Sequence, residues 1–133
     1  MPSVVVDTHA AVWYFLDYPR LSQTAGLILD QTTQSRDPIL IPSISLVELV
    51  YLIEEGRIPA STYTSLRKAI DNPIGPFSLA LLDQNVVDAV HSIDRQLVPD
   101  LPDHVIAATA LVLNLPLVSR DAKIRTSQIQ TIW

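Results

Sequence analysis

The chain has 133 residues, 48% of them hydrophobic, with 10 prolines, 3 glycines and no cysteine. This length supports one globular domain, residues 1–133, whose core is large enough to be stable without disulfides. The lack of cysteine excludes disulfides, thiolate zinc sites and cysteine nucleophiles. Nine Lys and Arg against 14 Asp and Glu give a net charge of −5, which argues against a protein that binds nucleic acid by charge alone.

No apolar run is long enough to cross a membrane, because the longest, residues 10–16, falls far short of the roughly 18 residues that a span requires. Met1-Pro2-Ser3 lacks the basic region of a signal peptide. We therefore expect a cytoplasmic protein with no membrane contact. A mean hydropathy of +0.28 predicts more apolar surface than so small a domain can hide, and residues 10–16 and 46–53 are the candidate exposed stretches.

Short apolar runs alternate with longer stretches of helical periodicity. In chain order, the pattern predicts a strand at 4–6, helices at 9–16 and 21–34, a strand at 39–41, helices at 43–55 and 59–69, a strand at 77–82, helices at 83–97 and 103–114, a strand at 115–118 and a short helix at 119–126. Continuously apolar strands separated by helices are typical of a parallel sheet covered on both faces. The predicted fold class is therefore α/β.

Four acidic residues fall where the chain leaves a strand or enters a helix. Asp7 follows the first strand, Glu48 lies in the second turn of the helix after the second strand, Asp103 opens the last long helix and Asp121 follows the fourth strand. Because the carboxyl ends of parallel strands meet at one edge of a sheet, we expect all four acids at that edge. Such a cluster would repel itself unless cations bound between its members.

Glu48 is the most informative of these acids, because its neighbours on the helix face are mostly apolar. They include Ile44, Ser45, Tyr51 and Leu52. A carboxylate on such a stripe requires a partner, since an uncompensated buried charge costs several kcal/mol. The sequence predicts that either a basic side chain or a metal ion meets Glu48.

Each acid also has a purely structural interpretation. Asp7 suits a turn at the end of a strand, and Asp103 and Asp121 suit the N-caps of their helices. Asp83 is interpreted first as a cap or turn residue. Asp100 is a cap or turn residue that could also join the site.

Oxygen ligands without cysteine or paired histidines favour Mg²⁺ or Mn²⁺ over zinc. In nucleases such ions activate a water molecule and bind phosphoryl oxygens. His9, His91 and His104 lack the mutual spacing of a zinc motif and are interpreted as structural, although His104, beside Asp103, could face the site. The sequence has no glycine-rich phosphate loop and no G-x-S-x-G turn, so nucleotide-cradle and serine-hydrolase functions have no support.

Four motifs in this order make the sequence similar to the PIN-domain ribonucleases, and within them to the VapC-like toxins of type II toxin–antitoxin pairs. The motifs are Val4-Val5-Val6-Asp7-Thr8-His9-Ala10 for the first acid, Ile41-Pro42-Ser43-Ile44-Ser45-Leu46-Val47-Glu48 for the second, residues 100–110 around Asp103 for the third and Leu117-Val118-Ser119-Arg120-Asp121 for the fourth. The similarity extends over nearly the whole chain. One departure is His104, where many relatives have arginine after the third acid.

The resemblance implies a PIN-like three-layer α/β/α sandwich with a central parallel sheet. It also implies an Mg²⁺- or Mn²⁺-dependent endoribonuclease, commonly a homodimer, which cleaves RNA and is held inactive by a VapB-like antitoxin. The catalytic and metal-site acids would then be Asp7, Glu48 and Asp103, supported by Asp121, with hydroxyls from Thr8 and Ser119.

Two other functions remain open at this point. One is a non-catalytic PIN-like module that binds a protein partner. The other is a phosphotransfer domain of the receiver or haloacid-dehalogenase type, since these also place an Asp after the first strand. Receivers have adjacent acids there, and the phosphatases have a second Asp where this chain has His9.

Overall fold

The computed structural model describes residues 3–121, 124 and 128–133. Its strands form one parallel sheet in the order β3-β2-β1-β4-β5. The strands are β1 (Val4–Val6), β2 (Ile39–Pro42), β3 (Phe77–Ala80), β4 (Leu117–Val118) and β5 (Thr131–Ile132). The helices are α1 (Thr8–Phe15), α2 (Gln23–Gln34), α3 (Ser43–Glu54), α4 (Thr62–Asp71), α5 (Gln84–Val90) and α6 (Leu101–Leu113). Within the described residues, no helix has the length and apolar character needed to traverse a bilayer.

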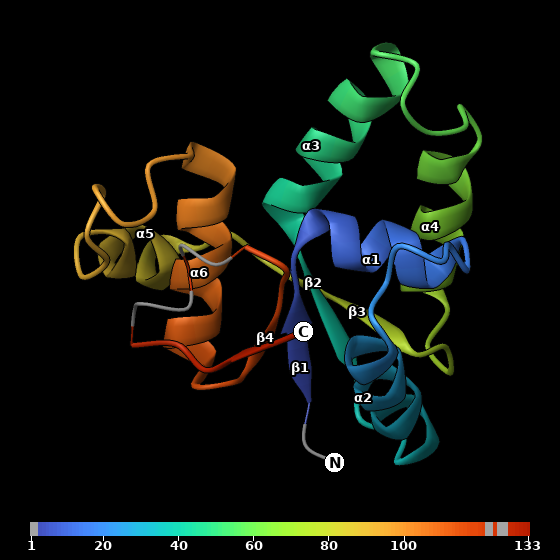
Figure 1. Ribbon diagram of the computed structural model, residues 1–133, viewed down its shortest axis with the longest axis horizontal. Helices are drawn as coiled ribbons and strands as arrows, with labels where there is room; N and C mark the ends of the chain where they lie inside the picture. The colour runs from blue at the N-terminus through green and yellow to red at the C-terminus, as the bar shows by residue number, and fades with distance from the viewer. Residues whose placement is uncertain (1–2, 122–123, 125–127) are drawn as a thin grey trace.

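Helices cover both faces of the sheet (Figure 1). Val4 and Val6 of β1 belong to one core cluster, which includes buried residues of α1, α2, α3 and α4. Val5, which points to the opposite face, packs with Leu117 of β4 against α5 and α6. All three valines are fully buried, which explains why this strand is continuously apolar. The expected three-layer α/β/α architecture with a central parallel sheet is confirmed.

The two stretches that were expected to be exposed behave differently. Residues 10–13 lie inside the core, because α1 packs directly on the sheet, and the expectation of exposure there is wrong. On α3, in contrast, Val47, Val50 and Tyr51 are exposed. These three residues, spaced three and four apart, form an apolar stripe on the outer side of that helix.

The largest difference from the predicted elements concerns residues 83–97. The helix ends at Val90, and the chain continues in turns in which the backbone amide of His91 bonds to Asp88 O and that of Val98 to Asp94 O. Periodicity predicted too long a helix here, because the buried residues Ile93 and Val98 reach the core from turns rather than from a helix face.

Other differences concern the ends of elements. The predicted strands at 77–82 and 115–118 are shorter, and β5 was not predicted. The helix expected to open at Asp103 begins at Leu101, because the side chain of Asp100 caps it. Residues 119–121 of the predicted short helix at 119–126 are not helical, and residues 122–123 and 125–126 lie outside the described residues.

The winding of the sheet reverses between β1 and β4. From β1 the chain proceeds to β2 and β3 on one side, whereas β4 and β5 pair on the other side of β1. Ligand sites of open parallel sheets lie outside the carboxyl ends of the strands at such a reversal. Asp7 follows β1 and Ser119 follows β4 at this point, so the fold places them where a site is expected.

Candidate active site

Asp7 stands at the carboxyl end of β1 and caps α1. Its Oδ1 accepts a hydrogen bond from the backbone amide of Ala10 at 2.9 Å, and the buried hydroxyl of Ser119 also bonds to this carboxylate. Ser119 Oγ in turn accepts a bond from the amide of Asp121 at 3.0 Å. The amide of Asp7 donates to Val118 O at 3.1 Å. These bonds tie the ends of β1 and β4 together and bring Asp7 and Asp121 to one edge.

Glu48 projects from the first half of α3 toward the start of α1. The hydroxyl of Thr8 donates a hydrogen bond to its carboxylate, and Thr8 Oγ1 lies 3.0 Å from Ser45 Oγ. Thr8 and Ser45 are buried, so the side chain that bonds to Glu48 is itself fixed by its surroundings. Neither ion pair found in the described part of the chain involves Glu48. Within those residues, the basic partner that the sequence allowed for Glu48 is not present.

Asp100 and Asp103 come from the start of α6. Asp100 is the N-cap, since its Oδ1 accepts a bond from the backbone amide of Asp103 at 3.2 Å. Asp103 therefore lies in the first turn, and its interpretation as the N-cap is wrong. Its carboxylate is available for another role.

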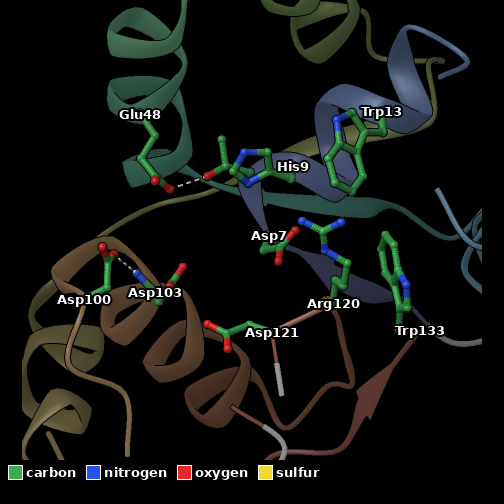
Figure 2. A pocket seen from close by; sticks show the side chains of 10 residues that line it. Asp7, His9, Trp13, Glu48, Asp100, Asp103, Arg120, Asp121 and Trp133 are labelled. Atoms are coloured by element: carbon green, nitrogen blue, oxygen red, sulfur yellow. Dashed lines mark hydrogen bonds between the residues drawn. The ribbon is translucent and has the colours of Figure 1, made fainter. Parts of the chain in front are cut away.

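The four predicted acids line one cavity of about 330 Å³ (Figure 2). The cavity opens at the carboxyl edge of the sheet and receives side chains from α1, α3, α6 and the turn after β4. Its lining residues are Asp7, Thr8, His9, Trp13, Glu48, Asp100, Asp103, Arg120, Asp121 and Trp133. The structure thus brings together Asp7, Glu48, Asp103 and Asp121, although their role as ligands stays a prediction.

Burial and the charges of neighbouring carboxylates raise the pKa values of three carboxyl groups in the cavity, those of Asp7, Glu48 and Asp103. Burial raises the pKa of Asp7, against the opposing effect of the hydrogen bonds that it accepts. Burial also raises the pKa of Glu48, and the charges of Asp100 and Asp7 raise it further. The pKa of Asp103 rises from 3.8 to about 7, first through burial and then through Asp100, Asp121 and Glu48. The site is therefore a concentration of negative charge that protons or cations relieve.

The donor set fits a hard divalent cation. Carboxylate oxygens are the ligands that Mg²⁺ and Mn²⁺ prefer, and Thr8 and Ser119 add hydroxyl groups that orient two of them. In the part of the chain that the structure describes, no three His, Cys, Asp or Glu side chains are already gathered closely enough to hold a metal ion. The carboxylates instead surround an open cavity.

Two residues considered from the sequence lie outside this site. Nε2 of His104 lies 2.9 Å from Val90 O and 3.0 Å from Ile93 O, so the ring points away from the cavity and joins α6 to the end of α5. Asp83 caps α5 by accepting a bond from the amide of Val86 at 3.0 Å. Asp100, in contrast, does join the cavity.

Sequence reasoning missed the aromatic side of the cavity. We call His9, Trp13, Arg120 and Trp133 the aromatic wall. His9 and Trp13 are four residues apart on α1 and therefore share a helix face, a signal that was available. Burial lowers the pKa of His9, and the negative charge of Asp7 opposes this effect. Trp133 follows β5, and only recognition of that strand would have placed it at the carboxyl edge.

Comparison with known proteins gives a family match and one curated relative. The model of a family described as PIN domain matches residues 4–127. Ribonuclease VapC22 of Mycobacterium tuberculosis (strain ATCC 25618 / H37Rv) is 25% identical over 140 residues, an alignment that covers 100% of both chains.

Solved structures share the fold at low sequence identity. The chain is similar to one in the crystal structure of VapBC2 from Rickettsia felis bound to a DNA fragment from their promoter. There the TM-score is 0.72 at 16% identity, covering 97% of this chain and 96% of the other. A toxin-antitoxin complex from Klebsiella pneumoniae gives a TM-score of 0.64 at 19% identity, covering 98% and 96%.

Proposed function

Because the chain belongs to the PIN-domain family, we propose that it is a metal-dependent endoribonuclease that hydrolyses RNA phosphodiester bonds. The observation that carries this proposal is the meeting of Asp7, Glu48, Asp103 and Asp121 at one cavity. A serine or cysteine nucleophile is not needed in such a site, since a bound cation can supply the nucleophile by activating water. We further propose that residues 1–133 act as a single PIN-like domain, because both core clusters share one sheet.

In this proposal Asp7, Glu48 and Asp103 hold Mg²⁺ or Mn²⁺, and Asp121 supports them. The cation, when bound, activates a water molecule and stabilises negative charge on the phosphate. The hydroxyl of Ser119 bonds to Asp7 and that of Thr8 to Glu48. These hydrogen bonds hold the two carboxylates in a fixed orientation.

We propose that the biological role is that of the toxin in a type II toxin–antitoxin pair, acting in the cytoplasm. Support comes from the relative named Ribonuclease VapC22 and from neighbours solved as toxin–antitoxin complexes. The partner is then a VapB-like antitoxin, and the toxin itself forms a homodimer. A small reading frame directly upstream, encoding a DNA-binding domain with an apolar tail, would supply the antitoxin to test by co-purification.

The decisive experiment is cleavage of RNA by the purified protein with and without divalent metal. We expect cleavage with Mg²⁺ or Mn²⁺, none in EDTA, and a loss of at least roughly a hundredfold in Asp7→Asn. Asp83→Asn, which removes a carboxylate outside the cavity, is the matched control and should cleave normally. Undiminished cleavage in EDTA would rule out the metal mechanism, and no cleavage with either ion would leave a protein-binding module as the function.

A further inference from the structure

The cavity has two chemically different sides (Figure 2). Glu48, Asp100 and Asp103 lie on one side, and Trp13, Arg120 and Trp133 of the aromatic wall lie on the other, with Asp7 and His9 between them. The proposed function accounts for the acidic side. It leaves the aromatic wall without a role.

Arg120 is held in a defined position on this wall. Its guanidinium carbon lies 5.0 Å from the centre of the Trp13 ring, and Trp13 is only 4% exposed, which makes it a fixed platform. Stacking on an aromatic face leaves the N–H groups at the edge of the guanidinium available to an anion. Neither ion pair found in the described part of the chain occupies Arg120.

Charge balance gives Arg120 a specific function. Of the described residues that line the cavity, it alone has a permanent positive charge, among five carboxylates. A polyanionic substrate that enters such a cavity requires a cation beside the acids, because the chain as a whole has a net charge of −5. Arg120 supplies this cation and is placed to bind a phosphate adjacent to the reacting one.

Trp133 and His9 complete an apolar, π-rich surface around the same point. Both rings lie beside Trp13. The centre of the Trp133 ring is 5.9 Å from the centre of the Trp13 ring at an interplanar angle of 60°, and the centre of the His9 ring is 5.3 Å from the centre of the Trp13 ring at 51°. Trp133 and His9 are only partly buried and line the cavity, so part of each ring is open to it. Unpaired RNA bases bind to such surfaces by stacking on aromatic rings and arginine planes.

We propose that Arg120, Trp133 and His9, backed by Trp13, form a subsite for the unpaired RNA nucleotide next to the bond that is cleaved. Arg120 binds the phosphate of that nucleotide, and Trp133 and His9 stack on its base. This inference rests on the proposed ribonuclease function and adds to it a defined binding site for the nucleotide beside the cleaved bond.

The chain supplies its own reporter for this subsite, because both of its tryptophans are in the aromatic wall. Tryptophan fluorescence of the full chain is titrated in EDTA with a short single-stranded RNA of mixed sequence, and with an abasic ribose-phosphate oligomer of the same length. We expect saturable quenching by RNA, and weaker binding with little quenching by the abasic oligomer.

Charge-matched variants separate the subsite from general attraction. Arg120→Gln should weaken RNA binding roughly tenfold and reduce the salt dependence of binding by about one phosphate contact, a slope change of about 0.7. Arg67→Gln, which removes an exposed arginine on α4, should bind as the wild type does. Trp133→Leu should bind more weakly, and Trp133→Phe should recover most of the affinity. Arg120 is exposed, so the loss in Arg120→Gln does not come from misfolding.

Either of two equal results would overturn the subsite. In the first, Arg120→Gln binds RNA as tightly as Arg67→Gln does; in the second, the abasic oligomer binds and quenches as strongly as RNA does. Cleavage by the wild type with Mn²⁺ is measured in parallel. Cleavage together with either equal result overturns the subsite and leaves the ribonuclease function standing. Quenching without cleavage supports the subsite and overturns that function. In cleavage, Arg120→Gln should raise KM more than it lowers kcat, as expected for a residue that binds the substrate away from the reacting bond.

Discussion

Asp103 shows most clearly how one side chain can be tested for a functional rather than a structural role. Asp100 already caps α6, so Asp103 is not needed for that purpose. Its charge costs stability, because burial and the neighbouring carboxylates raise its pKa. A residue that destabilises the metal-free protein and has no capping role is best explained by a ligand.

The pH dependence of stability provides the first test. The raised pKa means that protonated Asp103 favours the folded state, so its contribution to stability is fully present below pH 3.8 and is lost as the pH rises to about 7. In EDTA, the melting temperature of Asp103→Asn should therefore equal that of the wild type near pH 4 and exceed it at pH 8. Thermal melts across this range check the prediction, and a variant that melts below the wild type at pH 8 would contradict it.

The metal response of the same proteins is the second test. Millimolar Mg²⁺ or Mn²⁺ should raise the melting temperature of the wild type by more than that of Asp103→Asn, because binding to the folded state needs the missing carboxylate. Asp83→Asn, at the N-cap of α5 and outside the cavity, is the control and should respond as the wild type does. Equal shifts in all three proteins would remove Asp103 from the site.

At the scale of elements, one histidine joins α6 to the chain that follows α5. His104 Nε2 must carry a proton, since both of its neighbours, Val90 O and Ile93 O, are acceptors. The shared hydrogen bond replaces the helical bonds that the chain loses where α5 ends. It stabilises the irregular segment that brings Asp100 to the cavity.

Removing this bond should destabilise the fold and leave the metal response intact. His104→Ala removes the side-chain donor from both carbonyl groups, of which Val90 O keeps its bond from the amide of Ile93, and should lower the free energy of unfolding by about 1–3 kcal/mol. His91→Ala, in which the lost ring is exposed, is the control and should cost much less. Urea unfolding measures both, and an unchanged His104→Ala protein would show that the bond contributes nothing.

At the scale of the whole molecule, the exposed stripe on α3 is the surface that a partner would cover. Val47 is 51% and Tyr51 64% exposed, and this helix lies far from α2 in Figure 1. Leu82, which follows β3 and whose amide bonds to Ser43 Oγ at the start of α3, is a further exposed apolar residue. Contiguous apolar surface of this kind marks an interaction site.

We expect the purified protein to be a dimer that depends on this stripe. Light scattering at micromolar concentration should give twice the mass of the chain, and Val47→Lys should reduce it toward one chain, since a buried lysine charge without a partner is unfavourable. Leu27→Lys changes a residue of similar exposure, 54%, on α2 and should leave the mass unchanged. A wild-type monomer, or a Val47→Lys dimer, would contradict the assignment of this surface.

The α/β class, the parallel sheet and the meeting of the four acids could be predicted from the sequence because each follows from local order and direction. Apolar runs that are buried on both faces identify strands of a parallel sheet, and parallel strands all end at one edge. Asp7 and Asp121 follow such strands, so their approach required no knowledge of side-chain packing. Composition likewise excluded cysteine chemistry without any reference to structure.

Tertiary structure alone decided which of the other residues face the cavity. His104 and Asp100 are four residues apart, yet one bonds to the segment after α5 and the other lines the cavity. Trp13 and Trp133 meet because β5 adds to the sheet beside β4, which brings the last described residue to the first helix. Contacts between residues so distant in the chain depend on strand order and on the path of irregular segments. Local periodicity in the sequence does not reveal the strand order or the path of irregular segments, because packing of the whole core sets them.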